Sequence, residues 1–136
     1  MKIGLVVSRF NREVTREMEE RAVDKADELG VDVEKVRVPG AYDTPLAAKR
    51  FCERDDIDAV ATAGAVVTGD TDHDAVVTET AAEALTRVSL EHDKPVMLGI
   101  AGPGMSGAEA RERVDYGARA VESAVELLEA VNGISD

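Results

Sequence analysis

One of only two histidines in this sequence, His73, stands where an apolar run ends and a helical pattern begins. The apolar run is Ala59 to Val67, and the polar turn Thr68 to Asp72 joins it to the helix. A buried strand that enters a helix through a turn containing glycine exposes backbone N–H groups that suit an anion. Three interpretations follow: an anion-binding turn beside a proton-transfer residue, a metal site, or an ordinary capped helix start.

The spacing of possible metal ligands argues against the metal site. The other histidine, His92, lies at the far end of the same predicted helix, about five turns from His73. Its neighbours Glu91 and Asp93 make that region typical of a solvated helix terminus. Cys52 is the only cysteine and falls in an apolar helical stretch, which is typical of a packed thiol. The sequence therefore predicts no metal.

In this turn the backbone amides suit an anion better than the side chains do. Gly69 lets the chain turn so that the amides of Asp70, Thr71 and Asp72 converge on a phosphate or carboxylate. Thr71 could equally cap the helix that begins beside it. The carboxylates of Asp70 and Asp72 repel an anion unless they point away from it, so an anion site here needs a cation.

Two arginines and one phenylalanine extend these possibilities. Arg111 and Arg113 lie early in the last helical pattern on different faces, and either could pair with a nearby acid such as Glu109. They are nevertheless the arginines nearest the fourth polar loop. Phe10 lies in the turn after the first apolar run, where it could pack onto the following helix or offer a flat face to a planar ring.

Four apolar runs, each followed by a polar loop and a helical pattern, position these residues. The predicted strands are residues 2–7, 31–38, 57–67 and 95–100. The predicted helices are residues 12–29 with Asn11 as N-cap, 45–53, 73–91 and 107–130, the last after a glycine-rich loop over 101–105. This alternation predicts one α/β domain over residues 1–136, with a parallel sheet. Right-handed crossovers then bring all four loops to one edge of the sheet.

The charge of the chain excludes some classes of partner. Its 136 residues carry 28 acidic and 16 basic side chains, a net charge of −12. Such an acidic surface repels nucleic acids and anionic membranes, and it is typical of salt-adapted proteins. No targeting segment and no apolar run of membrane-spanning length is present, so we expect a cytoplasmic protein.

Five stretches together resemble a known family. They are Ser8 to Asn11, Val38 to Pro45, Gly64 to His73, Gly99 to Met105, and Glu112 to Gly117. In order and spacing, over residues 2 to about 130, they resemble lumazine synthase of riboflavin biosynthesis in its short archaeal form. The resemblance implies a three-layer sandwich with a four-stranded parallel, flavodoxin-like sheet flanked by helices.

The resemblance also implies a transferase reaction. The family condenses 5-amino-6-(D-ribitylamino)uracil with 3,4-dihydroxy-2-butanone 4-phosphate to 6,7-dimethyl-8-ribityllumazine, releasing phosphate and water without a cofactor. Phe10 would stack on the pyrimidine ring, and the Asp43 carboxylate would accept hydrogen bonds from the ribityl hydroxyls. The other residues implied for the pyrimidine substrate are Ala41 and Tyr42 around the ribityl chain, and the strand backbone of Ala65, Val66 and Val67 along the ring edge.

The phosphate substrate and the proton transfers are implied to use other residues. The amides of Asp70 and Thr71 would hold the phosphate, Arg113 would supply positive charge, and His73 would donate and accept protons. Leu98 would form an apolar wall. In the family, residues matching Leu98 and Arg113 come from a neighbouring subunit, which implies a homopentamer. Some members assemble twelve pentamers into a 60-subunit shell, and the sequence leaves both assemblies open.

Two alternatives remain beside this interpretation. Archaeal-type riboflavin synthase shares the fold and dismutates two lumazines, although the run Gly69 to His73 fits lumazine synthase better. A flavodoxin-like regulatory or binding module would also share the α/β pattern. A receiver-type module would need acidic residues after the first strand and an Asp ending the third, where this chain has Ser8-Arg9 and Val67-Thr68.

Overall fold

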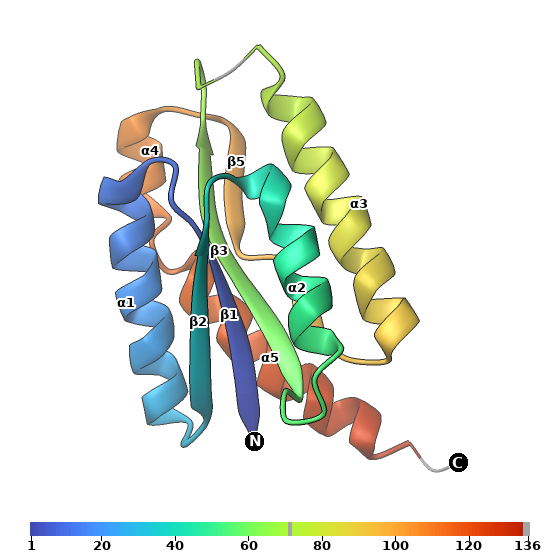
Figure 1. Cartoon of the computed structure of the whole chain (residues 1–136). Coiled ribbons are helices and arrows are strands. Elements are labelled where there is room, and N and C mark those ends of the chain that lie inside the picture. Colours follow the sequence, from blue (N-terminus) through green and yellow to red (C-terminus); the bar gives the residue numbers. More distant parts are fainter. Residues whose placement is uncertain (71, 135–136) are drawn as a thin grey trace.

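Apolar segments pair in parallel to form the sheet (Figure 1). The computed structural model describes residues 1–70 and 72–134. In it the strands are β1 (Lys2–Ser8), β2 (Asp32–Val38), β3 (Ala59–Val67), β4 (Val96–Met97) and β5 (Ile100–Met105). Their order is β2-β1-β3-β4, and β5 pairs with β3 farther along that strand. β1 and β3 are buried almost throughout, as expected of central strands with both faces covered.

Helices cover both faces of the sheet. They are α1 (Arg12–Glu28), α2 (Thr44–Cys52), α3 (Asp74–His92), α4 (Gly107–Glu112) and α5 (Tyr116–Asn132), with a short 3₁₀ turn η1 (Ala41–Asp43) before α2. Figure 1 shows α1, α4 and α5 on one face, and α2 and α3 on the other. The predicted α/β class, with a parallel sheet between helices, is confirmed.

The predicted count of four strands is wrong. Residues 95–100 contain a break at Leu98 and Gly99, and the glycine-rich segment expected to be a loop belongs to β5. The Thr62 hydroxyl spans the break, since it donates to the Met97 carbonyl and accepts from the Gly99 amide, each at 2.9 Å. A Cβ at Gly99 would collide with the Thr62 carbonyl oxygen, so only glycine lets the chain pass this close to β3.

The last predicted helix is also divided. The expected helix over 107–130 consists of α4 and α5, separated at residues 113–115. At the break Val114 is buried in the core, whereas Asp115 is exposed. The prediction failed here because no glycine or proline marks the break.

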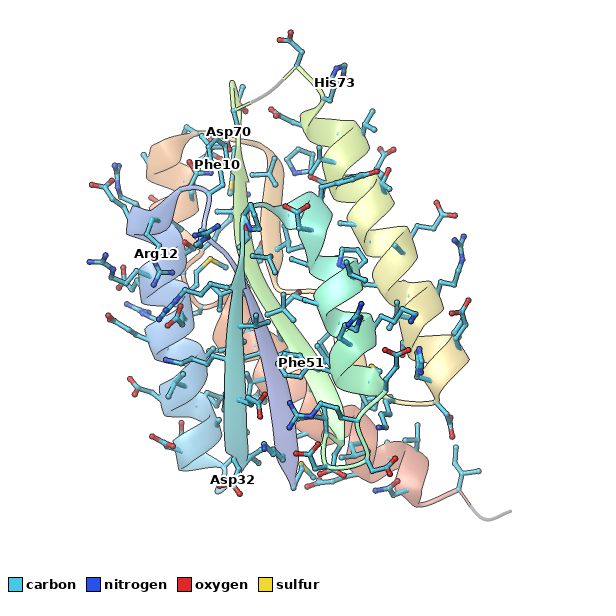
Figure 2. All side chains as sticks on the ribbon, in the orientation of Figure 1. Phe10, Arg12, Asp32, Phe51, Asp70 and His73 are labelled. Atoms are coloured by element: carbon cyan, nitrogen blue, oxygen red, sulfur yellow. The ribbon has the colours of Figure 1, made fainter. Side chains whose placement is uncertain are left out.

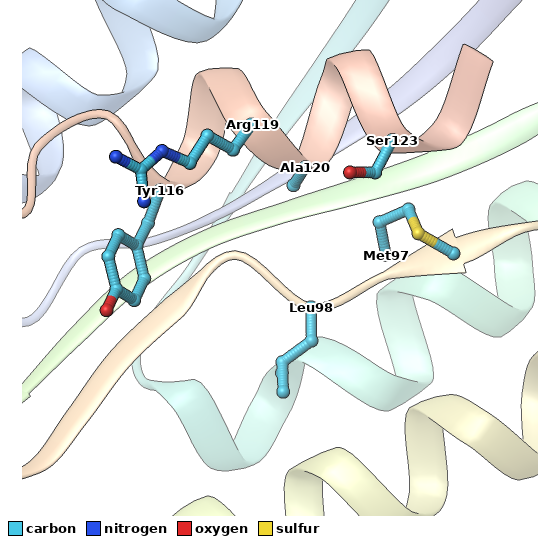
Figure 3. Close-up of a pocket in the computed structure, with 6 residues that line it drawn as sticks. All are labelled: Met97, Leu98, Tyr116, Arg119, Ala120 and Ser123. Carbon is cyan, nitrogen blue, oxygen red and sulfur yellow. The ribbon is translucent and has the colours of Figure 1, made fainter. Parts of the chain in front are cut away.

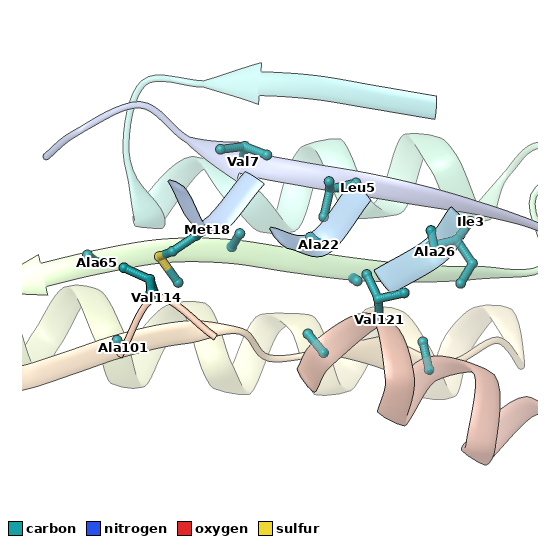
Figure 4. Packing of buried hydrophobic residues seen from close by; sticks show 14 of the residues in the cluster. Ile3, Leu5, Val7, Met18, Ala22, Ala26, Ala65, Ala101, Val114 and Val121 are labelled. Atoms are coloured by element: carbon teal, nitrogen blue, oxygen red, sulfur yellow. The ribbon is translucent and has the colours of Figure 1, made fainter. Parts of the chain in front are cut away.

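Small side chains let the elements pack closely on both faces. Between the sheet and α1 and α5, alanines such as Ala22 and Ala26 lie in one cluster with Leu5, Met18 and Val121, as Figure 4 shows. On the other face, α2 and α3 pack on a second cluster that contains the buried Cys52. Burial raises the pKa of the Cys52 thiol, in agreement with its interpretation as a packed thiol.

A charged cluster ties the exposed edge strand β2 to α1. Glu19 of α1 is only 4% exposed. It accepts hydrogen bonds from Arg37 at 2.7 and 2.9 Å, from Lys35 at 3.3 Å and from Arg12 at 3.2 Å. Mainly through the hydrogen bonds from Arg37, the pKa of Glu19 is lowered to about 2. We call these four residues the Glu19 cluster.

Among the described residues, no helix combines the length and the apolar character needed to cross a membrane.

Candidate functional site

Loops from three neighbouring strands meet at the carboxyl end of the sheet around a hollow of about 190 Å³. We call it the Phe10 hollow. Six residues predicted from the sequence line it: Phe10, Ala41, Tyr42, Ala65, Val66 and Asp70. Gly40 and Val77, which were not predicted, complete the lining. Three of the four loops expected at this sheet edge therefore meet at the hollow, whereas residues 101–105 belong to β5 and do not line it.

Two local hydrogen bonds shape the loop after β2. The Gly40 amide donates to Asp43 Oδ2 at 2.9 Å, and the buried Thr44 hydroxyl donates to the Ala41 carbonyl at 2.8 Å. These bonds close the turn η1 and leave the Tyr42 side chain 61% exposed beside the hollow. Asp43 is exposed next to the hollow rather than in its lining, and one of its carboxylate oxygens already closes the turn.

The loop after β1 is fixed to the loop after β2. Arg9 donates through its amide to the Val38 carbonyl at 2.8 Å, and Phe10 donates to the Pro39 carbonyl at 3.1 Å. The Phe10 side chain remains 51% exposed, so it is not buried against α1 and keeps a free ring surface at the hollow (Figure 2). That surface could accept a planar ring by stacking.

Asn11 departs from its predicted role as a side-chain cap. It occupies the N-cap position of α1, but its side chain makes no capping hydrogen bond. Its Nδ2 instead donates to the Ala65 carbonyl at 2.9 Å and to Asp70 Oδ2 at 2.7 Å. The residue type alone could not reveal this, because asparagine is an ordinary cap and its partners lie more than fifty positions away.

The turn after β3 is held by Asp70. Its Oδ2 accepts from the Val67 amide at 2.9 Å, and its own amide donates to the Val67 carbonyl at 3.1 Å. Gly69 has a φ of 94°, which only glycine adopts readily. The Asp70 amide is thus engaged within the turn, so its predicted contact with phosphate stays a prediction. Thr71 lies outside the described residues.

His73 stands at the N-cap position of α3 with an exposed side chain. Figure 2 shows it at the start of α3, above Asp70 and Phe10. It does not line the Phe10 hollow, but the turn that holds Asp70 leads directly to it. Its predicted part in proton transfer stays a prediction.

Leu98 and Arg113 are not brought to the Phe10 hollow within this chain. Leu98 is 49% exposed and lines a separate hollow of about 230 Å³ with Met97, Tyr116, Arg119, Ala120 and Ser123 (Figure 3). Arg113 lies 3.6 Å from Glu109 and 3.5 Å from Met105 Sδ. The half-buried Val67 lines a third hollow together with Arg111, which itself pairs with Glu13 at 3.6 Å.

Over residues 1–70 and 72–134, no three histidine, cysteine or acidic side chains come together so that they could hold a metal ion. The lining of the Phe10 hollow is mostly apolar, and the Asp70 carboxylate is its one acidic side chain.

Known proteins match nearly the whole chain. The family model for 6,7-dimethyl-8-ribityllumazine synthase matches residues 1–132. A protein of that name from Halobacterium salinarum is 60% identical over 129 residues, which cover 94% of this chain and 97% of the relative. Another from Halorubrum lacusprofundi is 58% identical over 130 residues, 95% of this chain and 97% of the relative. One from Methanocaldococcus jannaschii is 46% identical, covering this whole chain and 97% of the relative.

Proposed function

The chain belongs to the 6,7-dimethyl-8-ribityllumazine synthase family of riboflavin biosynthesis, and we propose that it performs the family's condensation at the Phe10 hollow. The substrates are 5-amino-6-(D-ribitylamino)uracil and 3,4-dihydroxy-2-butanone 4-phosphate. One observation carries the proposed location: six residues expected to hold these substrates line a single hollow, although they come from three separate segments of the chain. The proposal needs no cofactor and no metal.

In this proposal the hollow binds the pyrimidine substrate. The exposed ring of Phe10 stacks on the pyrimidine, while Tyr42 and Ala41 contact the ribityl chain. The Asp43 oxygen that does not close the turn accepts hydrogen bonds from the ribityl hydroxyls. The backbone of Ala65 to Val67 lies along the edge of the ring.

His73 moves protons in each step. The pyrimidine amine attacks the ketone and an imine forms with loss of water; elimination of phosphate and ring closure with loss of a second water complete the lumazine. An imidazole near these atoms can remove and return protons, which contributes ~10²–10⁴ in rate. Holding the two substrates together contributes up to about 7–11 kcal/mol of the barrier.

The phosphate site in this proposal is shared between subunits. Arg113 and Leu98 lie apart from the Phe10 hollow in one chain. We propose a homopentamer in which these residues reach the hollow of a neighbour, so that Arg113 supplies the positive charge that the acidic turn around Asp70 lacks. We also propose that residues 1–136 act as one domain in the cytoplasm.

The activity is tested with the purified protein at several salt concentrations. Incubated with both precursors, it should release phosphate and form the fluorescent lumazine; incubated with lumazine alone, it should form no riboflavin. Product from lumazine alone would identify a riboflavin synthase. If neither incubation gives product while circular dichroism shows a folded protein, the proposed reaction is wrong.

The assembly is tested by sedimentation equilibrium under the same conditions. Five times the mass of one chain is expected, and sixty times that mass would indicate the shell. A fully active monomer would contradict the proposed shared site, because Arg113 would then have no neighbouring subunit whose hollow it could reach.

A further inference from the structure

β3 extends beyond the end of its neighbour β1. β1 ends at Ser8, whereas β3 continues to Val67 after their last pair. The Gly64 amide donates to the carbonyl of Gly99, which lies between β4 and β5, and the Thr68 amide donates to the carbonyl of Met105 in β5. Because backbone groups alternate sides along a strand, those of Ala65 and Val67 face the opposite edge, where β1 has ended.

Two side chains complete this edge. Asn11 Nδ2 donates to the Ala65 carbonyl at 2.9 Å, and the Val67 amide donates to Asp70 Oδ2 at 2.9 Å. Asn11 Nδ2 also donates to the same Asp70 oxygen at 2.7 Å, which joins the two side chains. Backbone groups that lose contact with water need such partners. The Asn11–Asp70 link therefore takes the place of the missing length of β1.

The conformation of Asn11 fits it to this place. Its φ and ψ of 63° and 50° lie in the left-handed region, which asparagine adopts more readily than most residues other than glycine. Its side-chain amide has two N–H groups, and two acceptors face it. Although Asn11 occupies a helix N-cap, it uses its side chain on β3 rather than on α1.

The link joins the parts of the site that come from different loops. Asn11 directly follows Phe10, and Asp70 lines the same hollow and lies three residues before His73. A change in the link would move the Phe10 loop relative to β3, and it would release the turn that leads to His73. Displacements of this kind reduce the rate steeply even when no reacting group is lost.

We propose that the Asn11 carboxamide and the Asp70 carboxylate are positioning residues of the condensation site, holding the Phe10 loop and the turn before His73 against the end of β3. They act through the groups they hold. This inference rests on the proposed function, since it concerns the reaction at the same hollow.

The test measures kcat and both KM values for four variants, with circular dichroism as a check on folding. Asn11→Ala removes both donors, and Asp70→Ala removes the acceptor shared by Asn11 and Val67. Each should lower kcat/KM by about tenfold to hundredfold, with part of the loss in kcat. Asn11→Asp should lose more than Asn11→Ala, because it sets a second carboxylate against Asp70 and against the Ala65 carbonyl.

The conservative change separates positioning from charge. Both donors converge on one oxygen of Asp70, so the amide oxygen of Asp70→Asn can accept both hydrogen bonds. Asp70→Asn should therefore lose several-fold less activity than Asp70→Ala. Matched controls are Asn132→Ala, the same substitution at the other asparagine, and Asp24→Ala on the exposed face of α1. Both controls should keep the kinetic constants of the unchanged protein.

The outcomes distinguish this inference from the proposed reaction. If the unchanged protein forms lumazine while folded Asn11→Ala and Asp70→Ala keep its kcat and both KM values, the positioning role is wrong and the reaction stands. Equal losses in Asp70→Asn and Asp70→Ala would also contradict it. If Asn11→Ala does not fold, the two Asp70 variants decide, because Asp70 is only half-buried and follows the exposed residues Thr68 and Gly69.

Discussion

Between Ala59 and Ala63, β3 pairs along one edge with β1 and along the other with β4, main chain to main chain. Between Gly64 and Val67, β5 follows one edge with a shift of register, and the other edge is completed by the side chains of Asn11 and Asp70. We call these the paired part and the open part of β3. The Phe10 hollow lies at the open part.

The difference between the two parts of β3 separates the residues that stabilise the sheet from those that shape the site. Main-chain pairing tolerates any residue that can adopt a strand, whereas an edge completed by side chains depends on particular residues. The open part can therefore be shaped for a substrate without disturbing the ladder that holds the sheet. Substitutions near the open part should change activity more than stability, and substitutions beside the paired part should do the reverse.

The largest expected effect is on the rate, at His73. His73→Ala removes the imidazole proposed to transfer protons, so kcat should fall by ~10²–10⁴ while lumazine formation remains detectable. Urea unfolding should show a much smaller relative change, because the side chain is exposed. Lumazine fluorescence measures the rate.

His92→Ala is the matched control, since it removes the other histidine at the far end of α3. It should leave kcat unchanged. Full activity in His73→Ala would remove His73 from the mechanism and leave the open part without a proton-transfer residue.

The second effect is on stability, at Leu5 of β1 beside the paired part. Leu5 is fully buried, and Leu5→Ala leaves a cavity beneath α1, so the free energy of unfolding should fall by about 2–5 kcal/mol. The kcat of the molecules that remain folded should stay unchanged. Urea unfolding and the lumazine assay on the same sample measure both quantities.

Leu5→Met conserves volume and should cost less than about 1.5 kcal/mol. If Leu5→Ala instead lowered kcat strongly at modest loss of stability, the two parts of β3 would not be separable.

The paired part could be predicted from the sequence, because continuous apolar runs such as Ile3 to Val7 and Ala59 to Ala63 have few other places in an α/β protein. The gathering of Phe10, Ala41 and Asp70 at one edge was also predictable, because right-handed crossovers bring the loops after parallel strands to the same edge of the sheet. These features follow from local patterns and from the handedness of the chain.

The open part could not be predicted because it depends on contacts between distant residues. Asn11 has the type of an ordinary cap, and only the end of β1 beside Ala65 explains why its amide donates elsewhere. A Cβ at Gly102 would collide with the Val66 carbonyl, so the glycines of residues 101–105 accommodate a strand where the composition indicates a loop. The proposed contribution of Arg113 depends on a second chain and is absent from any local pattern.

The third effect concerns affinity at Arg113. Arg113→Ala removes the proposed cation of the phosphate site, a loss of about 1.5–3 kcal/mol, and should raise KM for the butanone phosphate by about tenfold to hundredfold. KM for the pyrimidine substrate should change much less. Arg111→Ala is the control, because Arg111 is an exposed arginine two positions away. Unchanged phosphate affinity would remove Arg113 from the site.

Mixing two variants tests whether the site is shared. If His73 and Arg113 of one site come from different subunits, oligomers reassembled from equal amounts of His73→Ala and Arg113→Ala should contain ~25% complete sites and regain activity. If both residues come from one chain, every site lacks one of them and the mixture should show only the mean of the two variants.

The smallest expected effect concerns the edge of the sheet, where the Glu19 cluster holds the edge strand β2 to α1. A carboxyl whose pKa is lowered on folding stabilises the fold above its ordinary pKa, near 4.5, and loses this contribution as the pH falls through its folded pKa of about 2. The contribution should be about 1–2 kcal/mol, because water screens the partly exposed Arg37 and Lys35.

Glu19→Gln keeps the shape of the side chain and removes its charge, so the difference in unfolding free energy between the unchanged protein and this variant should shrink as the pH is lowered from 4.5 toward 2. Urea unfolding at several pH values measures it, with Glu20→Gln, on the exposed face of α1, as the control. Because Glu19 does not line the Phe10 hollow and takes no part in the Asn11–Asp70 link, lumazine formation near neutral pH should be unaffected. A pH-independent difference would mean that Glu19 stabilises by packing alone. A loss of activity would mean that the open part depends on β2 as well as on the Asn11–Asp70 link.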